Sequence, residues 1–120
     1  MPTRRLKTHT AATGYVYQYL FVGKRQALPG DPDAPADEYI FDASSDRKVT
    51  FSVSVFIQQR ALEVWAKAHG RKLTDAEQYA AAKMRLLRGF DEVENMIEHG
   101  RRLLVDSAVL DELLTPLGVE

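Results

Sequence analysis

Three stretches of the N-terminal half carry the apolar, β-branched and aromatic residues typical of strands, and in the third of them apolar and polar positions alternate with a period of two residues. The first stretch covers residues 14–22 and is closed by Gly23, and the second covers residues 38–42. The third covers residues 48–57, where one face carries Val49, Phe51, Val53 and Val55 and the other carries Thr50, Ser52 and Ser54. A loop of about ten residues, rich in proline and acids, separates the first two strands, and residues 43–47 have the composition of a hairpin turn.

The period becomes helical from Ile57 onwards. A first helix is predicted to begin there, to bury Trp65 against the sheet and to end near Gly70, because glycine favours the backbone conformation that terminates helices. The sequence TDAE at residues 74–77 is a capping-box pattern, in which the threonine and glutamate side chains satisfy each other's backbone amides. We therefore expect a second helix from this point to about Glu98.

The C-terminal part is less regular. Residues 101–106 fit either a fourth, edge strand or the end of the second helix, and residues 107–114 predict a short helix that stops before Pro116. Strands that precede helices predict an α+β fold, with an antiparallel sheet of three or four strands and two to three C-terminal helices packed on one face. Residues 1–12 are expected to form a basic N-terminal arm, and residues 13–120 a single α+β domain.

Four aromatic side chains stand two residues apart in the first predicted strand, so an extended backbone places them on one face: Tyr15, Tyr17, Tyr19 and Phe21. The opposite face of this strand is nearly as apolar, and the sequence leaves open which face meets the helices. If the aromatic rings point outward, they stand beside Thr50, Ser52 and Ser54 and form a candidate interaction surface. If they point inward, they are ordinary core.

Composition narrows the class of protein. A chain of 120 residues with 45% apolar residues corresponds to one globular domain. Because it contains no cysteine, it has no disulfide, thiolate zinc site or cysteine nucleophile. No segment approaches the roughly 20 apolar residues of a membrane span, and polar residues interrupt the only run resembling a signal peptide. We expect a cytoplasmic protein with no membrane partner.

Charge is unevenly distributed although the net charge is only −1. The first 25 residues contain no acid and five basic residues, Arg4, Arg5, Lys7, Lys24 and Arg25, and the next 25 contain six acids against two bases. Basic residues that flank an aromatic strand are typical of single-stranded nucleic-acid binding, where rings stack on bases and cations meet phosphates. The pI near 6.3, the acidic loop that follows directly, and the lack of an RNA-recognition strand motif argue against it.

Signals of catalysis or metal binding are weak. The three histidines, at positions 9, 69 and 99, show no metal-ligand spacing, and no serine lies in a nucleophile elbow. Asp91, Glu94 and Glu98 fit a solvated helix face better than an acid–base site, and Asp31, Asp33 and Asp42 match a calcium loop poorly. We therefore expect no cofactor and no metal.

These observations favour a non-catalytic interaction or regulatory module over an enzyme. The broad apolar surface of the second helix and the two-sided first strand exceed what one small helical layer covers, which predicts a homodimer or a protein partner. Single-stranded nucleic-acid binding through Tyr15, Tyr17 and Tyr19 is the alternative. A small-ligand-binding domain or an enzyme of unspecified reaction ranks third.

Overall fold

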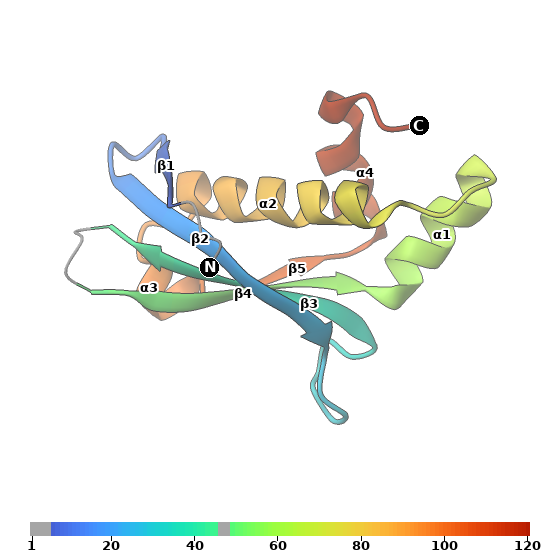
Figure 1. Ribbon diagram of the computed structural model, residues 1–120, viewed down its shortest axis with the longest axis horizontal. Helices are drawn as coiled ribbons and strands as arrows, with labels where there is room; N and C mark the ends of the chain where they lie inside the picture. Colours follow the sequence, from blue (N-terminus) through green and yellow to red (C-terminus); the bar gives the residue numbers. More distant parts are fainter. Residues whose placement is uncertain (1–5, 46–48) are drawn as a thin grey trace, which may run out of the picture.

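The computed structural model describes residues 6–45 and 49–120, and its fold is α+β (Figure 1). A curled sheet of five strands carries helices on one face. In chain order, the elements are β1 (Lys7–Thr10), β2 (Val16–Gln26), β3 (Ala36–Ser44), β4 (Phe51–Gln58), α1 (Gln59–His69), α2 (Asp75–Glu92), α3 (Met96–His99), β5 (Arg102–Val105), α4 (Ser107–Leu114) and a 3-10 turn (Thr115–Leu117).

The strands lie in the sheet in their order along the chain, from β1 to β5. Neighbours from β1 to β4 are antiparallel, whereas β5 is parallel to β4. A parallel pair needs a crossover connection, and the segment containing α1, α2 and α3 supplies it. The sheet is therefore mixed, and the uncertain segment at 101–106 forms its edge strand.

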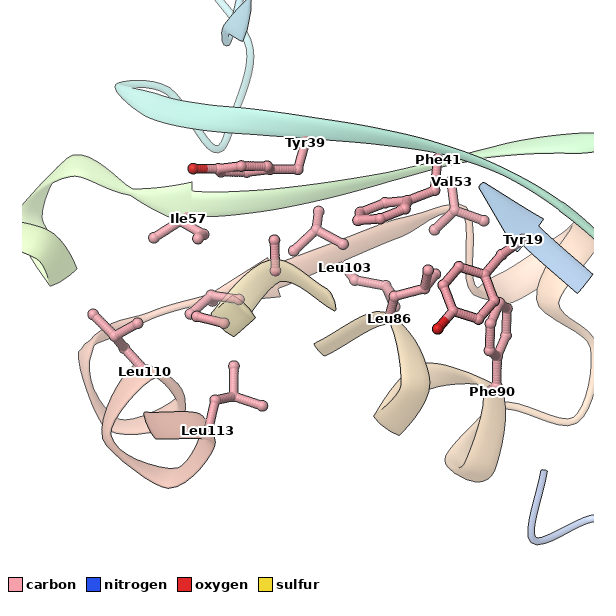
Figure 2. Close-up of a cluster of buried hydrophobic side chains, with 14 of the residues drawn as sticks. Tyr19, Tyr39, Phe41, Val53, Ile57, Leu86, Phe90, Leu103, Leu110 and Leu113 are labelled. Carbon is pink, nitrogen blue, oxygen red and sulfur yellow. The ribbon is translucent and has the colours of Figure 1, made fainter. Parts of the chain in front are cut away.

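The core lies between the sheet and α2, with α4 and α1 closing one end (Figures 1 and 2). Figure 2 shows side chains of the strands pointing toward those of α2 and α4, among them Tyr19, Tyr39, Phe41, Val53, Ile57, Leu86, Phe90, Leu110 and Leu113. Trp65 is buried as expected, and His69 one turn later stacks on it with 4.1 Å between ring centroids. None of the described helices combines the length and apolarity needed to span a membrane.

Several boundaries differ from those predicted. β2 continues past Gly23, because a shift in register between Phe21 and Gly23 lets the strand go on pairing with β3. Ile57 belongs to β4, and α1 begins only at Gln59. Lys7–Thr10, within the expected N-terminal arm, pairs with β2 as strand β1.

The second helix begins as predicted and ends earlier than predicted. The Thr74 hydroxyl accepts a hydrogen bond from the Glu77 amide at 3.1 Å, and the Glu77 carboxylate accepts one from the Thr74 amide at 2.8 Å. The helix stops at Glu92, since Val93 takes an extended backbone conformation and Asn95 starts α3 by accepting a hydrogen bond from the Glu98 amide. Glu94 therefore lies in a linker between two helices.

Candidate functional site

The aromatic stripe of β2 faces the helices. Tyr17 and Tyr19 are only 3% and 4% exposed, and both contact the ring of Phe90 on α2. Phe21 packs edge-on against Tyr79, also on α2. Tyr15, just before the strand begins, remains 55% exposed. Three of the four rings thus belong to the core, and Tyr15 alone of these four presents its ring to solvent.

The hydroxyl residues lie on the other side of the sheet. Ser52 and Ser54 alternate with the buried residues Val53 and Val55, and Thr50 lies just before the strand and is exposed. The expectation that the tyrosines stand beside these hydroxyls on one outer face is therefore wrong. The rings of Tyr17, Tyr19 and Phe21 turn toward the helices because Phe90 and Tyr79 of α2 provide aromatic contacts on that side of the sheet.

Two of the five residues of the basic flank, Lys24 and Arg25, are paired within the chain. Lys24 lies 3.6 Å from Asp37, and Arg25 lies 2.9 Å from Glu38 across the β2–β3 hairpin. Lys7 lies next to Lys83 on α2, and the side-chain contact with Lys7, followed by burial and the charge of Lys7, lowers the pKa of Lys83. Arg4 and Arg5 lie outside the described residues. Tyr17 and Tyr19 therefore turn away from solvent, and Lys24 and Arg25 are paired within the chain.

One end of the outer sheet face carries an ionic cluster. Glu38 is 5% exposed and accepts hydrogen bonds from Arg25 at 2.9 Å and from the Ser54 hydroxyl at 2.7 Å. Burial alone would raise the pKa of Glu38, but these two hydrogen bonds outweigh it and the pKa is lowered. The charged groups at this end therefore bind one another.

The acidic loop between β2 and β3 joins the same end of the sheet. Arg102 on β5 donates hydrogen bonds to Asp31 at 2.8 Å and to Asp33 at 2.9 Å, and its guanidinium lies 4.2 Å from the ring centroid of Phe56. The backbone amide of Asp33 and then Arg102 lower the pKa of Asp31. The loop thus folds back onto the sheet, which explains why Phe56 is buried although it points away from the helices.

The remainder of the outer face is poor in charge. We call it the outer-face patch and define it by the partly or fully exposed residues Val16, Gln18, Leu20, Ile40, Asp42 and Ser52. Cross-strand pairing makes it continuous, since Leu20 lies opposite Asp42 and Asp42 lies opposite Ser52. A hollow of about 350 Å³ beside it is lined by Leu6, Leu20 and Thr50, among others. The described helices pack on the opposite face (Figure 1).

A larger pocket lies at the end of the sheet near the β1–β2 turn and α3. We call it the Tyr15 pocket; its volume is about 630 Å³. Buried side chains form its floor, namely Tyr17, Phe51 and Met96, and exposed ones form its rim, namely Tyr15, Glu94 and Ile97. The sequence indicated Tyr15, but Glu94 was expected on a helix face, so its place at the pocket depends on the early end of α2.

A histidine and a carboxylate that are far apart in sequence meet at the edge of the sheet. His9 Nε2 lies 2.9 Å from Asp91 Oδ1, and the same oxygen accepts a hydrogen bond from the Ala12 amide at 2.9 Å. The contact with His9, and then that with Ala12, lowers the pKa of Asp91. Across the described residues His9 has no hydroxyl partner, and no group of three or more potential ligands is placed to hold a metal ion. The pair therefore fastens β1 to α2.

Comparison with protein-family models, with curated proteins and with solved structures finds no match to this chain.

Proposed function

We propose that the chain is a non-catalytic interaction module that associates with a second copy of itself through the outer-face patch. The observation that carries this proposal is a sheet face that the described helices leave uncovered and on which three of the six patch residues are aliphatic. Contiguous apolar surface of this kind usually marks an interaction site.

The charge of the patch supports the same proposal. Charged residues make up 28% of the chain, yet Asp42 is the single charged member of the patch. Interface centres are depleted in charge, whereas an ordinary wet sheet face is not. The groups needed to satisfy Asp42 are present in the patch itself, since Gln18 and Ser52 of a second copy can donate hydrogen bonds to it.

Two-fold symmetry suits this surface because the patch extends over three adjacent strands, β2, β3 and β4. In a closed dimer the same patch meets itself, so one self-complementary surface is sufficient. The ionic cluster formed by Arg25, Glu38 and Arg102 with the acidic loop lies beside the patch and would form its polar rim.

Sedimentation velocity over a range of concentrations tests the proposal. Wild type should approach twice 13.5 kDa at tens of micromolar. Leu20→Glu should shift the equilibrium toward monomer by tenfold or more, because it replaces about 1.5–3 kcal/mol of apolar burial with a desolvated charge.

Val64→Glu is the matched control. Val64 is 45% exposed on α1, away from the sheet's outer face, so this variant should sediment as wild type. A wild-type particle of 13.5 kDa at these concentrations would contradict self-association. Dissociation by Val64→Glu with retention of the dimer by Leu20→Glu would show that a helix surface is used instead.

A further inference from the structure

We infer that the Tyr15 pocket binds a small organic cation of the alkylammonium class. Four separate segments of the chain meet there: the β1–β2 turn with the start of β2, the end of β3, the start of β4 and the α2–α3 linker with α3. Its volume of about 630 Å³ lies within the range of small-molecule sites.

The accessible lining of the pocket is mainly polar, and three apolar side chains lie fixed beneath it. Tyr17, Phe51 and Met96 are 3%, 6% and 2% exposed, so their side chains are held by the core whether or not a ligand is present. Such a floor suits the alkyl groups of an organic cation. It does not suit a strongly hydrated inorganic ion, which would lose its water without receiving oxygen ligands in return.

The exposed ring of Tyr15 forms a wall of the pocket, and the buried ring of Tyr17 lies beside it with its other contacts made to Phe90. The planes of Tyr15 and Tyr17 meet at 59°, with 6.4 Å between centroids. A cation is attracted to the negative face of an aromatic ring, and this attraction grows when the site excludes water. Tyr15 is 55% exposed, so its ring is accessible to a ligand. A ligand lying in the corner would cover it.

The negative charge at the pocket favours a positively charged ligand. Glu94 supplies the charged group among the described lining residues, and within the described chain it forms no ion pair or hydrogen bond. Asp91 and Glu92, on the turn before it, are already engaged by His9 and Arg88, so within the described chain Glu94 is the carboxylate of this turn available to a ligand. An ammonium group is attracted by both the rings and Glu94, whereas an anion is repelled.

The backbone that carries Glu94 is ordered. The hydrogen bond from the Glu98 amide to the Asn95 side chain, 3.2 Å long, caps α3 immediately after Glu94 and fixes the linker. The carboxylate is therefore presented by an ordered turn rather than by a fraying helix end.

The probes are choline and its neutral carbon isostere, 3,3-dimethylbutan-1-ol, which have nearly the same shape and differ in charge. Titration followed by amide NMR shifts should give saturable changes with choline at Tyr15, Glu94 and Ile97. The neutral isostere should bind about tenfold more weakly or worse, because it lacks the attraction to rings and carboxylate.

Substitutions of the lining residues test whether choline binds in the Tyr15 pocket. Tyr15→Ala and Glu94→Gln should each weaken choline binding by about three- to tenfold. Glu98→Gln is the matched control, because its side chain is 68% exposed on the same segment and does not line the pocket, so binding should stay within about twofold of wild type.

Absence of saturable shifts, equal binding of the two probes, or equal losses in Glu94→Gln and Glu98→Gln would each overturn the inference. The outcome does not depend on self-association, since the pocket opens beside the inward-facing Tyr17 and the outer-face patch lies on the other face. Leu20→Glu should therefore bind choline as wild type does.

Discussion

The ring of Tyr17 lies nearly parallel to that of Phe90, with 4.2 Å between centroids and 6° between the planes. Tyr19 contacts the same ring at 5.9 Å, and His9 stacks on it at 6.0 Å. Aromatic pairs of this kind contribute about 0.5–1.5 kcal/mol beyond the burial of their surface. Phe90 therefore links α2 to both β1 and β2.

Truncation of Tyr17 should show this structural role. Tyr17→Ala should lower the free energy of unfolding by about 3–5 kcal/mol in urea denaturation, because it leaves a cavity against Phe90. Tyr15→Ala is the control at the neighbouring ring and should change stability by no more than about 0.5 kcal/mol, since Tyr15 is mostly exposed. Equal effects of the two changes would contradict the arrangement of rings described above.

The direction of the stripe could not be predicted from the sequence because both faces of β2 are apolar. Val16, Leu20 and Val22 alternate with the aromatic residues, so burial energy alone does not distinguish the faces. The aromatic face turns inward because its rings pack on Phe90 and Tyr79 of α2, and these two residues are remote from β2 in the sequence. By contrast, the burial of Trp65 followed directly from its helical spacing.

At the scale of elements, local sequence signals were sufficient to predict a feature where the residues that determine it are close together in the sequence. The capping box at 74–77 fixed the start of α2, and the alternation of β4 fixed which of its residues point inward. β1 was missed because KTHT has no apolar alternation and is a strand only through pairing with β2. The end of α2 was misplaced because apolar spacing continues through Ile97 although the backbone does not.

That misplaced end also hid part of the candidate site. A continuous helix would put Glu94 and Glu98 on one solvated face, whereas the break after Glu92 brings Glu94 to the Tyr15 pocket. The pairing of His9 with Asp91 was hidden for a different reason, since it joins residues 82 positions apart.

The start of α2 should make stability depend on pH. Hydrogen bonds from Arg71, and then from the Thr74 amide, lower the pKa of Glu77 from 4.5 to about 2. A depressed carboxyl pKa contributes stability that is fully present above the unfolded value and is lost as pH falls through the folded value. This contribution should therefore disappear between about pH 4.5 and pH 2.

Glu77→Gln tests this dependence because it removes the titrating group. Wild type should be more stable than Glu77→Gln at neutral pH, and the difference should shrink across this window in thermal denaturation followed by circular dichroism. Glu63→Gln, an exposed acid on α1, should show no such convergence. A constant difference between wild type and Glu77→Gln would mean that the pair with Arg71 does not persist in solution.

At the scale of the molecule, the outer sheet face divides into an ionic end and a charge-poor end. Arg25, Glu38 and Arg102 are engaged at the first, and the outer-face patch occupies the second. If the patch joins two copies, unfolding becomes linked to dissociation, so stability depends on protein concentration.

The midpoint of thermal unfolding should therefore rise with concentration. Wild type should show this rise over a hundredfold range of concentration, while Leu20→Glu should unfold at a midpoint that does not vary. A midpoint that stays constant for wild type as well would show that the folded unit is the single chain.

The parallel pairing of β5 with β4 sets the order in which the chain can acquire its structure. Ser54 pairs with Arg102, and the inward side chains of β4 are covered by α2 and by α4, which follows β5. During synthesis the antiparallel hairpins leave the ribosome first, with Val53, Val55 and Ile57 still without their cover. Pairing β5 with β4 requires the long segment between them to close, which is slow. Strands whose apolar side chains are still exposed in the meantime are prone to aggregate. Because β5 and α4 complete the cover that α2 begins, a variant lacking residues 102–114 should expose the inward side chains of β4 and aggregate more readily than the full chain.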